Sequence, residues 1–365
     1  MNLIIDKSNW IKVRLGDIAF EYSKRINNPK ESDYDKFVGS SNIGQWDFRI
    51  KSWESTDSVT SAMKLFEPND YLLVRRSLYA SDFRERAPRA DFYGVCSGDI
   101  LTIKENPDFL SDGFLIGVLN SPDLWKYVVA NASGSITRRI KWKDLANYQF
   151  LLPPKDQQAR LASLLWALDE VMEREKELLD ATETIKNSLL KRFKKQGENS
   201  TKYRIGDLMS FNYGSALKES DRIGGKYSVV TSSGFQGTHI EFLTKGPGIV
   251  VGRKGNAGQV TWVENNFWTT DTAYFIEIKK EFGHIPLKIF YYLLVAANLG
   301  KHSIATAVPG LNRDDALMTN VFLPKCEEID SYLEKFNILD EQILKIQTKK
   351  NASKALQKSL INQIF

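Results

Sequence analysis

Cysteine and histidine are scarce in this sequence. Its 365 residues include two cysteines, Cys96 and Cys326, and three histidines, His239, His284 and His302. The two cysteines are far apart and cannot form a disulfide framework, and the histidines lack the spacing of metal ligands. The sequence therefore predicts neither a disulfide-stabilised fold nor a zinc centre.

Long apolar runs are also lacking. No window approaches the roughly 20 apolar residues that cross a membrane, and the first ten residues, MNLIIDKSNW, have no apolar core typical of an export signal. These absences favour a cytoplasmic protein. Lysine and arginine number 50 against 45 aspartates and glutamates, a balance that permits a nucleic-acid partner without requiring one.

Motifs of common catalytic sites are absent as well. Leu152-Pro153-Pro154-Lys155 has the prolines of an amino-methyltransferase loop but not its polar and aromatic flanks. The segment 252–258 is rich in glycine, yet no Gly-Lys-Ser/Thr follows as in a phosphate-binding loop. Glu277-Ile278-Lys279, with Asp271 or Glu264 upstream, faintly resembles the metal site of a nuclease. Alternation of charged and apolar residues along a strand is the simpler interpretation.

A repeat organises the chain. Over some forty residues its two copies keep one register, 171 positions apart: Pro153 with Pro324, Leu168-Asp169-Glu170 with Leu339-Asp340-Glu341, and Ser188-Leu189-Leu190 with Ser359-Leu360-Ile361. Such constancy is typical of a helix, because an insertion would rotate all later side chains by about 100°. Apolar residues spaced three and four apart form one stripe in each copy.

The sequence therefore predicts two helices, at 155–197 and 325–365, each about 60 Å long at ~1.5 Å per residue. We expect their apolar stripes to pack against each other, and two unrelated surface helices are the alternative. Upstream, Lys12–Ile18 matches Lys202–Leu208 at a spacing of 190, which predicts two related globular domains at 1–154 and 198–324. Each Gly-Asp of this match should close a strand, with the aspartate capping a helical turn.

Both globular domains are predicted to be α+β. Short β-leaning runs and apolar helices alternate in them. The expected strands are 71–74, 100–103, 227–230, 248–251 and 272–278, and the expected helices are 109–118, 122–130 and 287–297.

Three pairs of polar loops recur in the same order in the two halves. The first pair, 38–46 and 230–237, offers neutral donors and acceptors, and an amide can make a two-point contact with adenine. The second pair, 74–77 and 251–258, follows a buried strand, and the third, 133–141 and 306–313, precedes the closing strand. Arginine in these loops suits guanine and phosphate because its guanidinium group presents two N–H donors side by side. Turns that bond their own backbone and a solvated basic surface are the alternatives.

The candidate DNA-binding residues are drawn from these loops and from the run just beyond 74–77. Base-reading candidates are Ser41, Asn42, Gln45, Arg76, Thr137 and Arg138 in the first half, and Ser233, Gln236, Arg253, Asn256 and Asn312 in the second. Phosphate-binding candidates, which position without specifying, are Arg84, Arg89, Lys141, Lys254 and Arg313, and Arg75 and Arg139 complete the set.

The chain resembles the DNA-specificity (S) subunits of type I restriction-modification systems. The resemblance rests on Leu152-Pro153-Pro154 to Glu170 and its repeat from Leu323-Pro324, on the paired Leu-Gly-Asp and Ile-Gly-Asp segments, and on Pro309–Asp314. The order globule, long helix, globule, long helix extends it over essentially the whole chain.

This resemblance implies two tandem target recognition domains, each reading half of a split DNA sequence. The two helices are implied to pack as an antiparallel coiled coil with pseudo-twofold symmetry and to act as a spacer. Two methyltransferase subunits that bind S-adenosylmethionine would dock on the chain, and restriction/translocase subunits would complete the complex. The chain itself would be no enzyme and would hold no cofactor. The rival hypotheses are a metal-dependent nuclease using Glu277 and Lys279 and a helical scaffold that never touches DNA.

Overall fold

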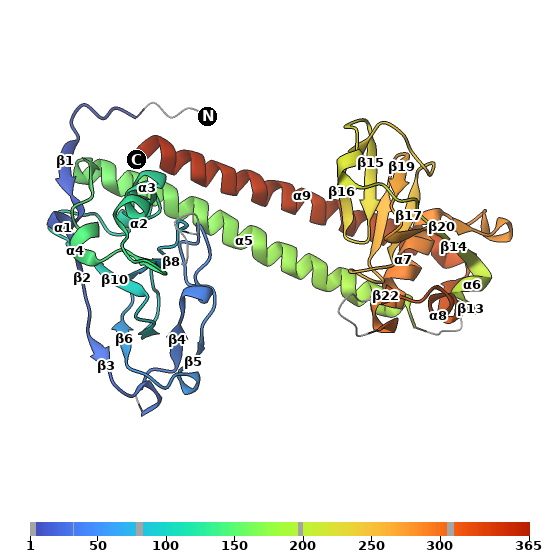
Figure 1. Ribbon diagram of the computed structural model, residues 1–365, viewed down its shortest axis with the longest axis horizontal. Coiled ribbons are helices and arrows are strands. Elements are labelled where there is room, and N and C mark those ends of the chain that lie inside the picture. Colours follow the sequence, from blue (N-terminus) through green and yellow to red (C-terminus); the bar gives the residue numbers. More distant parts are fainter. Residues whose placement is uncertain (1–4, 32, 78–82, 196–199, 305–309) are drawn as a thin grey trace. The chain divides into compact units, whose positions relative to one another are not determined.

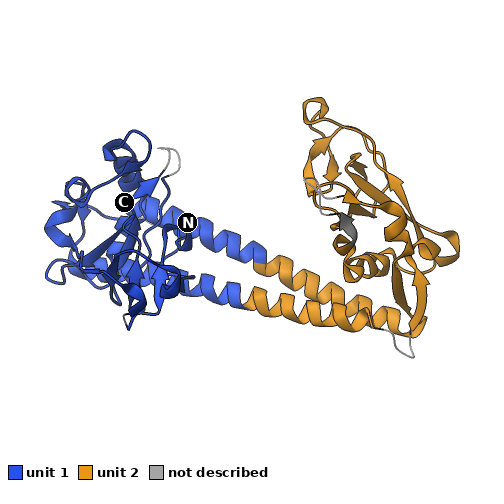
Figure 2. Ribbon diagram, turned by 60° about the horizontal axis from the view of Figure 1, so that its bottom comes forward, with its two compact units in different colours: residues 1–177, 347–365 blue, residues 178–346 orange. Residues whose placement is uncertain are grey.

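The computed structural model describes residues 5–31, 33–77, 83–195, 200–304 and 310–365. The fold is α+β, with two long helices, α5 (Lys155–Phe193) and α9 (Cys326–Ile364) (Figure 1). Contacts divide the chain into unit 1, residues 1–177 with 347–365, and unit 2, residues 178–346 (Figure 2). Each unit thus groups one globular region with the helical segments that pack on it. Within the described residues, no helix is both long and apolar enough to cross a membrane.

In unit 1, the first and last strands of the globular region pair with each other. β1 (Ile11–Arg14) is antiparallel to β12 (Gln149–Leu152), which leads directly into α5. Between them lie a three-stranded antiparallel sheet and a five-stranded sheet. The first sheet runs β2 (Ala19–Glu21), β10 (Ile100–Glu105), β7 (Tyr71–Val74), and the second β3 (Arg25–Ile26), β6 (Met63–Phe66), β9 (Gly94–Cys96), β4 (Lys36–Val38), β5 (Glu54–Ser55).

Short helices cover the three-stranded sheet of unit 1 and complete its core. They are α1 (Leu15–Ile18), α2 (Leu115–Leu119), α3 (Pro122–Asn131) and α4 (Trp142–Leu145). The same core includes Leu165 of α5 and Ile361 of α9. Both long helices therefore contribute buried apolar side chains to this globular region.

Unit 2 repeats the closing strand pair. β13 (Ser200–Arg204) is antiparallel to β23 (Asn320–Pro324), which precedes α9. A four-stranded antiparallel sheet runs β14 (Met209–Tyr213), β20 (Ala273–Ile278), β17 (Gly248–Gly252), β18 (Val260–Val263). The other strands are β15 (Tyr227–Thr231), β16 (Gly234–His239), β19 (Phe267–Thr269), β21 (Ser303–Ile304) and β22 (Gly310–Leu311), and the helices are α6 (Ile205–Leu208), α7 (Leu287–Ala297) and α8 (Arg313–Met318).

Two expectations from the sequence need correction. The predicted helix 109–118 begins only at Leu115, because Gly113 before it adopts a positive φ of 73° that favours a turn. The Gly-Asp pairs do not close strands: Gly16-Asp17 lies inside α1, after β1 has ended at Arg14. The predicted cap is confirmed, since the Asp17 carboxylate accepts the Arg14 backbone N–H at 3.2 Å.

The long helices bury only part of their apolar stripes. In unit 2, Phe193 of α5 packs against Phe336 of α9 with ring centroids 5.5 Å apart, and both belong to the core of that unit. Part of the predicted apolar stripe is nevertheless exposed to solvent. The stripe residues left exposed are Leu164, Val171, Leu178, Ile185 and Leu356.

Candidate nucleic-acid interface

The second and third predicted loops of unit 1 come together in the fold. β8 (Arg76–Ser77), in the second loop, pairs antiparallel with β11 (Arg138–Arg139), in the third. The Ile140 backbone N–H also donates to the Arg75 carbonyl at 3.0 Å. Chain segments some sixty residues apart thus bring Arg76, Arg138 and Arg139 into one two-stranded ribbon, and Arg75 directly precedes it.

A single carboxylate holds two of these arginines. Asp99, in the turn before β10, receives Arg76 Nη1 on one oxygen at 2.7 Å and Arg139 Nη2 on the other at 2.9 Å. The Arg75 Nε donates to the Gly98 carbonyl in the same turn at 3.0 Å. Arg138 instead donates from Nη2 to the Ala132 carbonyl at 2.8 Å. Hydrogen bonds and ion pairs within the chain therefore orient all four arginine side chains.

The first loop of unit 1 packs against the segment 84–89 rather than against that ribbon. Gln45 Nε2 donates to the Glu85 carboxylate at 2.6 Å, and Arg86 Nη1 donates to the Ser40 carbonyl at 3.4 Å. The Asn42 side-chain oxygen accepts the Gly39 N–H at 2.8 Å. Ser41 is exposed. The amides of Asn42 and Gln45 thus already use part of their hydrogen-bonding capacity within the protein.

The other basic candidates of unit 1 differ in exposure. The Arg89 side chain is 13% exposed and forms an ion pair with Asp112, with its guanidinium 5.8 Å from the Tyr71 ring centroid. Arg84 and Lys141 are exposed, and Thr137 is half-buried. Arg84 and Lys141 are consequently placed to meet a phosphate, whereas Arg89 would first have to leave a partly buried ion pair.

In unit 2 all three predicted loops meet. Asn256 Nδ2 donates to Ser233 Oγ at 3.3 Å, which joins the second loop to the first. The Leu311 N–H donates to the Arg253 carbonyl at 2.8 Å, and Lys254 forms a β-bridge with Gly310, which joins the second loop to the third. Gln236 and Ser233 are exposed. Residues 305–309 of the third loop lie outside the described residues.

Tyr213, at the end of β14, lies beside the arginines of two of these loops. The guanidinium carbons of Arg253 and Arg313 are 5.1 Å and 5.4 Å from its ring centroid. Neither Tyr213 nor Asp99 was among the predicted site residues, since both take part through loops distant in sequence and no local motif marks them.

The Asn312 side chain stabilises the start of helix α8. It is the N-cap of α8, and its Oδ1 accepts the backbone N–H groups of Asp314 at 2.8 Å and Asp315 at 3.4 Å. A two-point base contact by this amide would need the oxygen that the helix already uses. The geometry thus favours a capping role at this position.

The residues of the rival nuclease hypothesis are engaged elsewhere. The Glu277 carboxylate accepts Asn212 Nδ2 at 2.8 Å, and the Glu264 carboxylate accepts Trp262 Nε1 at 2.7 Å. Among the residues that the structure describes, no group of three or more potential ligands is placed to hold a metal ion. The loops of both units instead gather hydrogen-bonding and cationic groups suited to DNA edges and phosphates.

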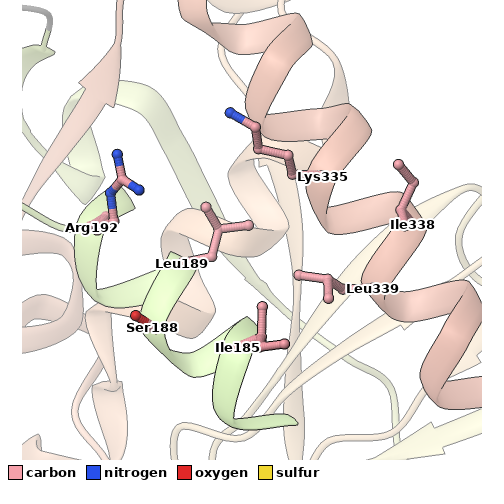
Figure 3. A pocket seen from close by; sticks show the side chains of 7 residues that line it. All are labelled: Ile185, Ser188, Leu189, Arg192, Lys335, Ile338 and Leu339. Carbon is pink, nitrogen blue, oxygen red and sulfur yellow. The ribbon is translucent and has the colours of Figure 1, made fainter. Parts of the chain in front are cut away.

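The helical segments of unit 2 carry an apolar groove (Figure 3). It measures about 410 Å³ and is lined by Ile185, Ser188, Leu189 and Arg192 of α5 and by Lys335, Ile338 and Leu339 of α9. Ile185 and Ile338 remain 58% and 48% exposed. The groove is thus an apolar surface on the helices, rimmed by two cations.

Comparisons with known proteins place these features in context. Residues 197–364 match the family described as "Type I restriction modification DNA specificity domain". The S subunit of a type I restriction-modification system from M. genitalium is similar in structure, with a TM-score of 0.68 and 16% identity over 98% of this chain and 96% of that one. A chain from a study of complex assembly and conformational transition of the type I R-M system has a TM-score of 0.56 and 15% identity, covering 97% of both chains. No curated protein sequence matches.

Proposed function

We propose that the chain is a DNA specificity subunit of a type I restriction-modification system, as the family match of residues 197–364 supports, and that its two globular regions each read one half of a bipartite DNA target. The observation that carries this proposal is the convergence of the polar loops. In unit 1 the second and third loops form one ribbon, and in unit 2 all three loops are joined by hydrogen bonds. The loops of unit 2 thereby gather amides, hydroxyls and arginines at one place, whereas in unit 1 the arginines lie on the ribbon and the amides of the first loop pack against residues 84–89.

We propose that the hydroxyl and amide side chains of these loops, together with Arg138, read bases and that exposed cations hold phosphates. Ser41, Asn42 and Gln45 with Thr137 and Arg138 serve the first half-site, and Ser233, Gln236 and Asn256 the second. Arg84, Lys141 and Lys254 contact the backbone. Asn312 and Arg89 do not enter the proposal, because a helix cap and an ion pair occupy them.

We further propose that α5 and α9 form an antiparallel coiled coil that acts as a spacer. Two contacts support this arrangement. In unit 1, Ser353 Oγ donates to the Glu175 carboxylate at 3.2 Å. In unit 2, Lys186 forms an ion pair with Asp340 at 2.6 Å. Later residues of α5 thus meet earlier residues of α9, as in an antiparallel pair. A rod of constant length would set the number of unread base pairs, at ~3.4 Å each.

Methyltransferase subunits are the proposed partners of the helices. The groove of Figure 3 offers an apolar floor with Arg192 and Lys335 at its rim, which suits an amphipathic helix with acidic flanks. S-adenosylmethionine would bind to those subunits, and restriction/translocase subunits would supply cleavage. The chain itself would then contribute recognition of the DNA sequence.

Exchange of one globular region tests the reading proposal. Residues 202–323 are replaced by the equivalent segment of a related subunit, and DNA methylation is mapped in cells that also carry the methyltransferase. We expect the methylated sequence to change in one half only. A change in both halves, or in neither, would contradict the proposal.

A matched insertion tests the spacer. Seven residues after Glu177 and seven after Lys350 would keep the apolar stripes aligned and lengthen the rod by ~10 Å. The unread gap should grow by about three base pairs. Methylation of the original target with an unaltered gap would rule out the spacer.

A further inference from the structure

Tyr213 organises the basic side chains of unit 2. It is 52% exposed, and the guanidinium carbons of Arg253 and Arg313 lie 5.1 Å and 5.4 Å from its ring centroid. Arg253 directly follows β17, whereas Arg313 is the first residue of α8. One ring at the end of β14 therefore contacts cations from two loops that are sixty residues apart.

The ring has a rigid support. Tyr213 faces Tyr274 across the β14–β20 ladder, and their ring centroids are 5.2 Å apart. Tyr274 is 2% exposed, and its hydroxyl donates to the Leu311 carbonyl at 3.3 Å. Burial, followed by the neighbouring Tyr213, raises the pKa of Tyr274 to about 12, so this hydroxyl stays a donor at neutral pH. Strand pairing and a hydrogen bond to the third loop thus hold the platform in place.

Unit 1 pairs the equivalent loops in a different way. Arg76 of its second loop and Arg139 of its third are brought together by Asp99. Both globular regions therefore assemble one arginine from each of the same two loops, although the residue that holds the pair is a carboxylate in unit 1 and an aromatic ring in unit 2. The recurrence indicates that the pair itself matters.

Asp99 in unit 1 and Tyr213 in unit 2 leave different net charges at the two arginine pairs. Asp99 neutralises one of the two positive charges in unit 1, whereas a ring attracts cations without neutralising them. The only carboxylate within ion-pair range of Arg313 among the described residues is Asp314, at 3.7 Å and with its side chain 82% exposed. Such an exposed pair contributes little. Arg253 and Arg313 thus keep two positive charges beside the same ring.

We propose that Tyr213 is a positioning residue that holds Arg253 and Arg313 as a clamp for the DNA backbone phosphate at the second half-site. The inference rests on the proposed function and deepens it. It assigns Arg253 to phosphate rather than to a base, because the same ring orients it and Arg313. Preorganisation by the ring spares the two long side chains part of the entropy that they would lose on binding.

The test measures binding of the full chain to a random-sequence 30-base-pair duplex by fluorescence anisotropy at several KCl concentrations. Arg253→Ala and Arg313→Ala should each make the slope of log K against log salt shallower by about 0.9. Tyr213→Ala should weaken binding about fivefold, because the two arginine side chains would then lose more conformational entropy on binding. Tyr213→Phe keeps the ring and should bind like the wild type. Arg204→Ala, at the N-cap of α6, is the arginine control and should leave the slope unchanged.

A double-mutant cycle separates positioning from other roles of the ring. In the Arg253→Ala/Arg313→Ala background, Tyr213→Ala should cause no further loss of affinity. An undiminished fivefold loss in that background would overturn the clamp and indicate that the ring stacks on DNA directly. Unchanged slopes in both arginine variants would also overturn it. If the wild type, with its methyltransferase, showed no DNA binding at any salt concentration, the proposed function itself would fail instead.

Discussion

Arg49 donates from Nε to the Asp169 carboxylate at 2.6 Å and thereby joins the first globular region to α5. Its Nη2 also donates to Glu170 at 3.1 Å. Asp340 is the repeat counterpart of Asp169, and in unit 2 its carboxylate accepts the Tyr292 hydroxyl of α7 at 2.6 Å. The Leu-Asp-Glu motif found in both copies of the repeat is therefore the point where each helix anchors its own globular region.

Replacing Arg49 by alanine should destabilise the protein, because the buried Asp169 carboxylate would lose its ion-pair partner. The Asp169 side chain is 2% exposed and that of Arg49 38%, so Arg49→Ala leaves the carboxylate buried without its main partner. We expect a loss of about 2 kcal/mol in the free energy of unfolding at pH 7, measured by urea denaturation. Asp169→Asn in the same background should restore most of it. Arg174→Ala, which removes an exposed pair with Glu170, is the control and should change little.

The decrease in the free energy of unfolding caused by Arg49→Ala should depend on pH. Burial already raises the pKa of Asp169, more than the Arg49 guanidinium lowers it, and removal of the guanidinium raises this pKa further. Stability due to the protonated carboxyl is fully present below the unfolded pKa of about 3.9 and is lost as pH rises through the folded pKa. Arg49→Ala should therefore destabilise the protein less at pH 4 than at pH 7, and an equal loss at both would contradict this account.

Replacing Gln357 by leucine should stabilise the protein. This α9 side chain is fully buried, and neither of its polar atoms has a hydrogen-bond partner among the described residues. Because a buried unpaired amide costs about 1–3 kcal/mol, we expect Gln357→Leu to raise the free energy of unfolding by about 1 kcal/mol. Gln347→Leu on the same helix changes an exposed position and serves as the control. A destabilised Gln357→Leu protein would show that the amide has a partner.

Removing Asp99 should change how unit 1 responds to salt. Asp99→Ala frees Arg76 and Arg139 from the carboxylate that neutralises one of their charges. We expect tighter binding to random-sequence duplex at low salt and a slope of log K against log salt steeper by about 0.9. Asp123→Ala removes the same charge from α3, where Asp123 pairs with Lys126. Equal effects of the two variants would mean that only net charge matters.

Substitutions at Asn312 should affect stability before recognition. Asn312→Ala removes the cap of α8 and should cost about 1 kcal/mol in the free energy of unfolding, whereas Asn312→Asp keeps an acceptor oxygen and should preserve stability. Because the cap already uses the amide oxygen, Asn312→Asp should leave the methylated sequence of the second half-site unchanged. A shift in that sequence, mapped in cells carrying the methyltransferase, would restore Asn312 as a base reader.

Much of the secondary structure was predictable because its signals are local. Strand β7 and helix α7 have the predicted bounds, Tyr71–Val74 and Leu287–Ala297, since each is a continuous apolar segment between polar or turn residues. The predicted helix at 109–118 failed at Gly113, whose positive φ accompanies close contact with Trp166 of α5: a Cβ there would come within 2.5 Å of the indole nitrogen. That contact involves a residue about fifty positions away, and the spacing of apolar residues along the sequence cannot predict it.

The sequence by itself determined the repeat, the two long helices and the loops that carry polar and basic side chains, because periodicity, register and composition are properties of neighbouring residues. Only the tertiary structure decided what those side chains do. It brought Asp99 to Arg76, 23 positions away, set Tyr213 beside Arg253 and Arg313, and used Asn312 as a cap. Such pairings depend on how strands align and where loops end in space, and these are set by packing over the whole globular region.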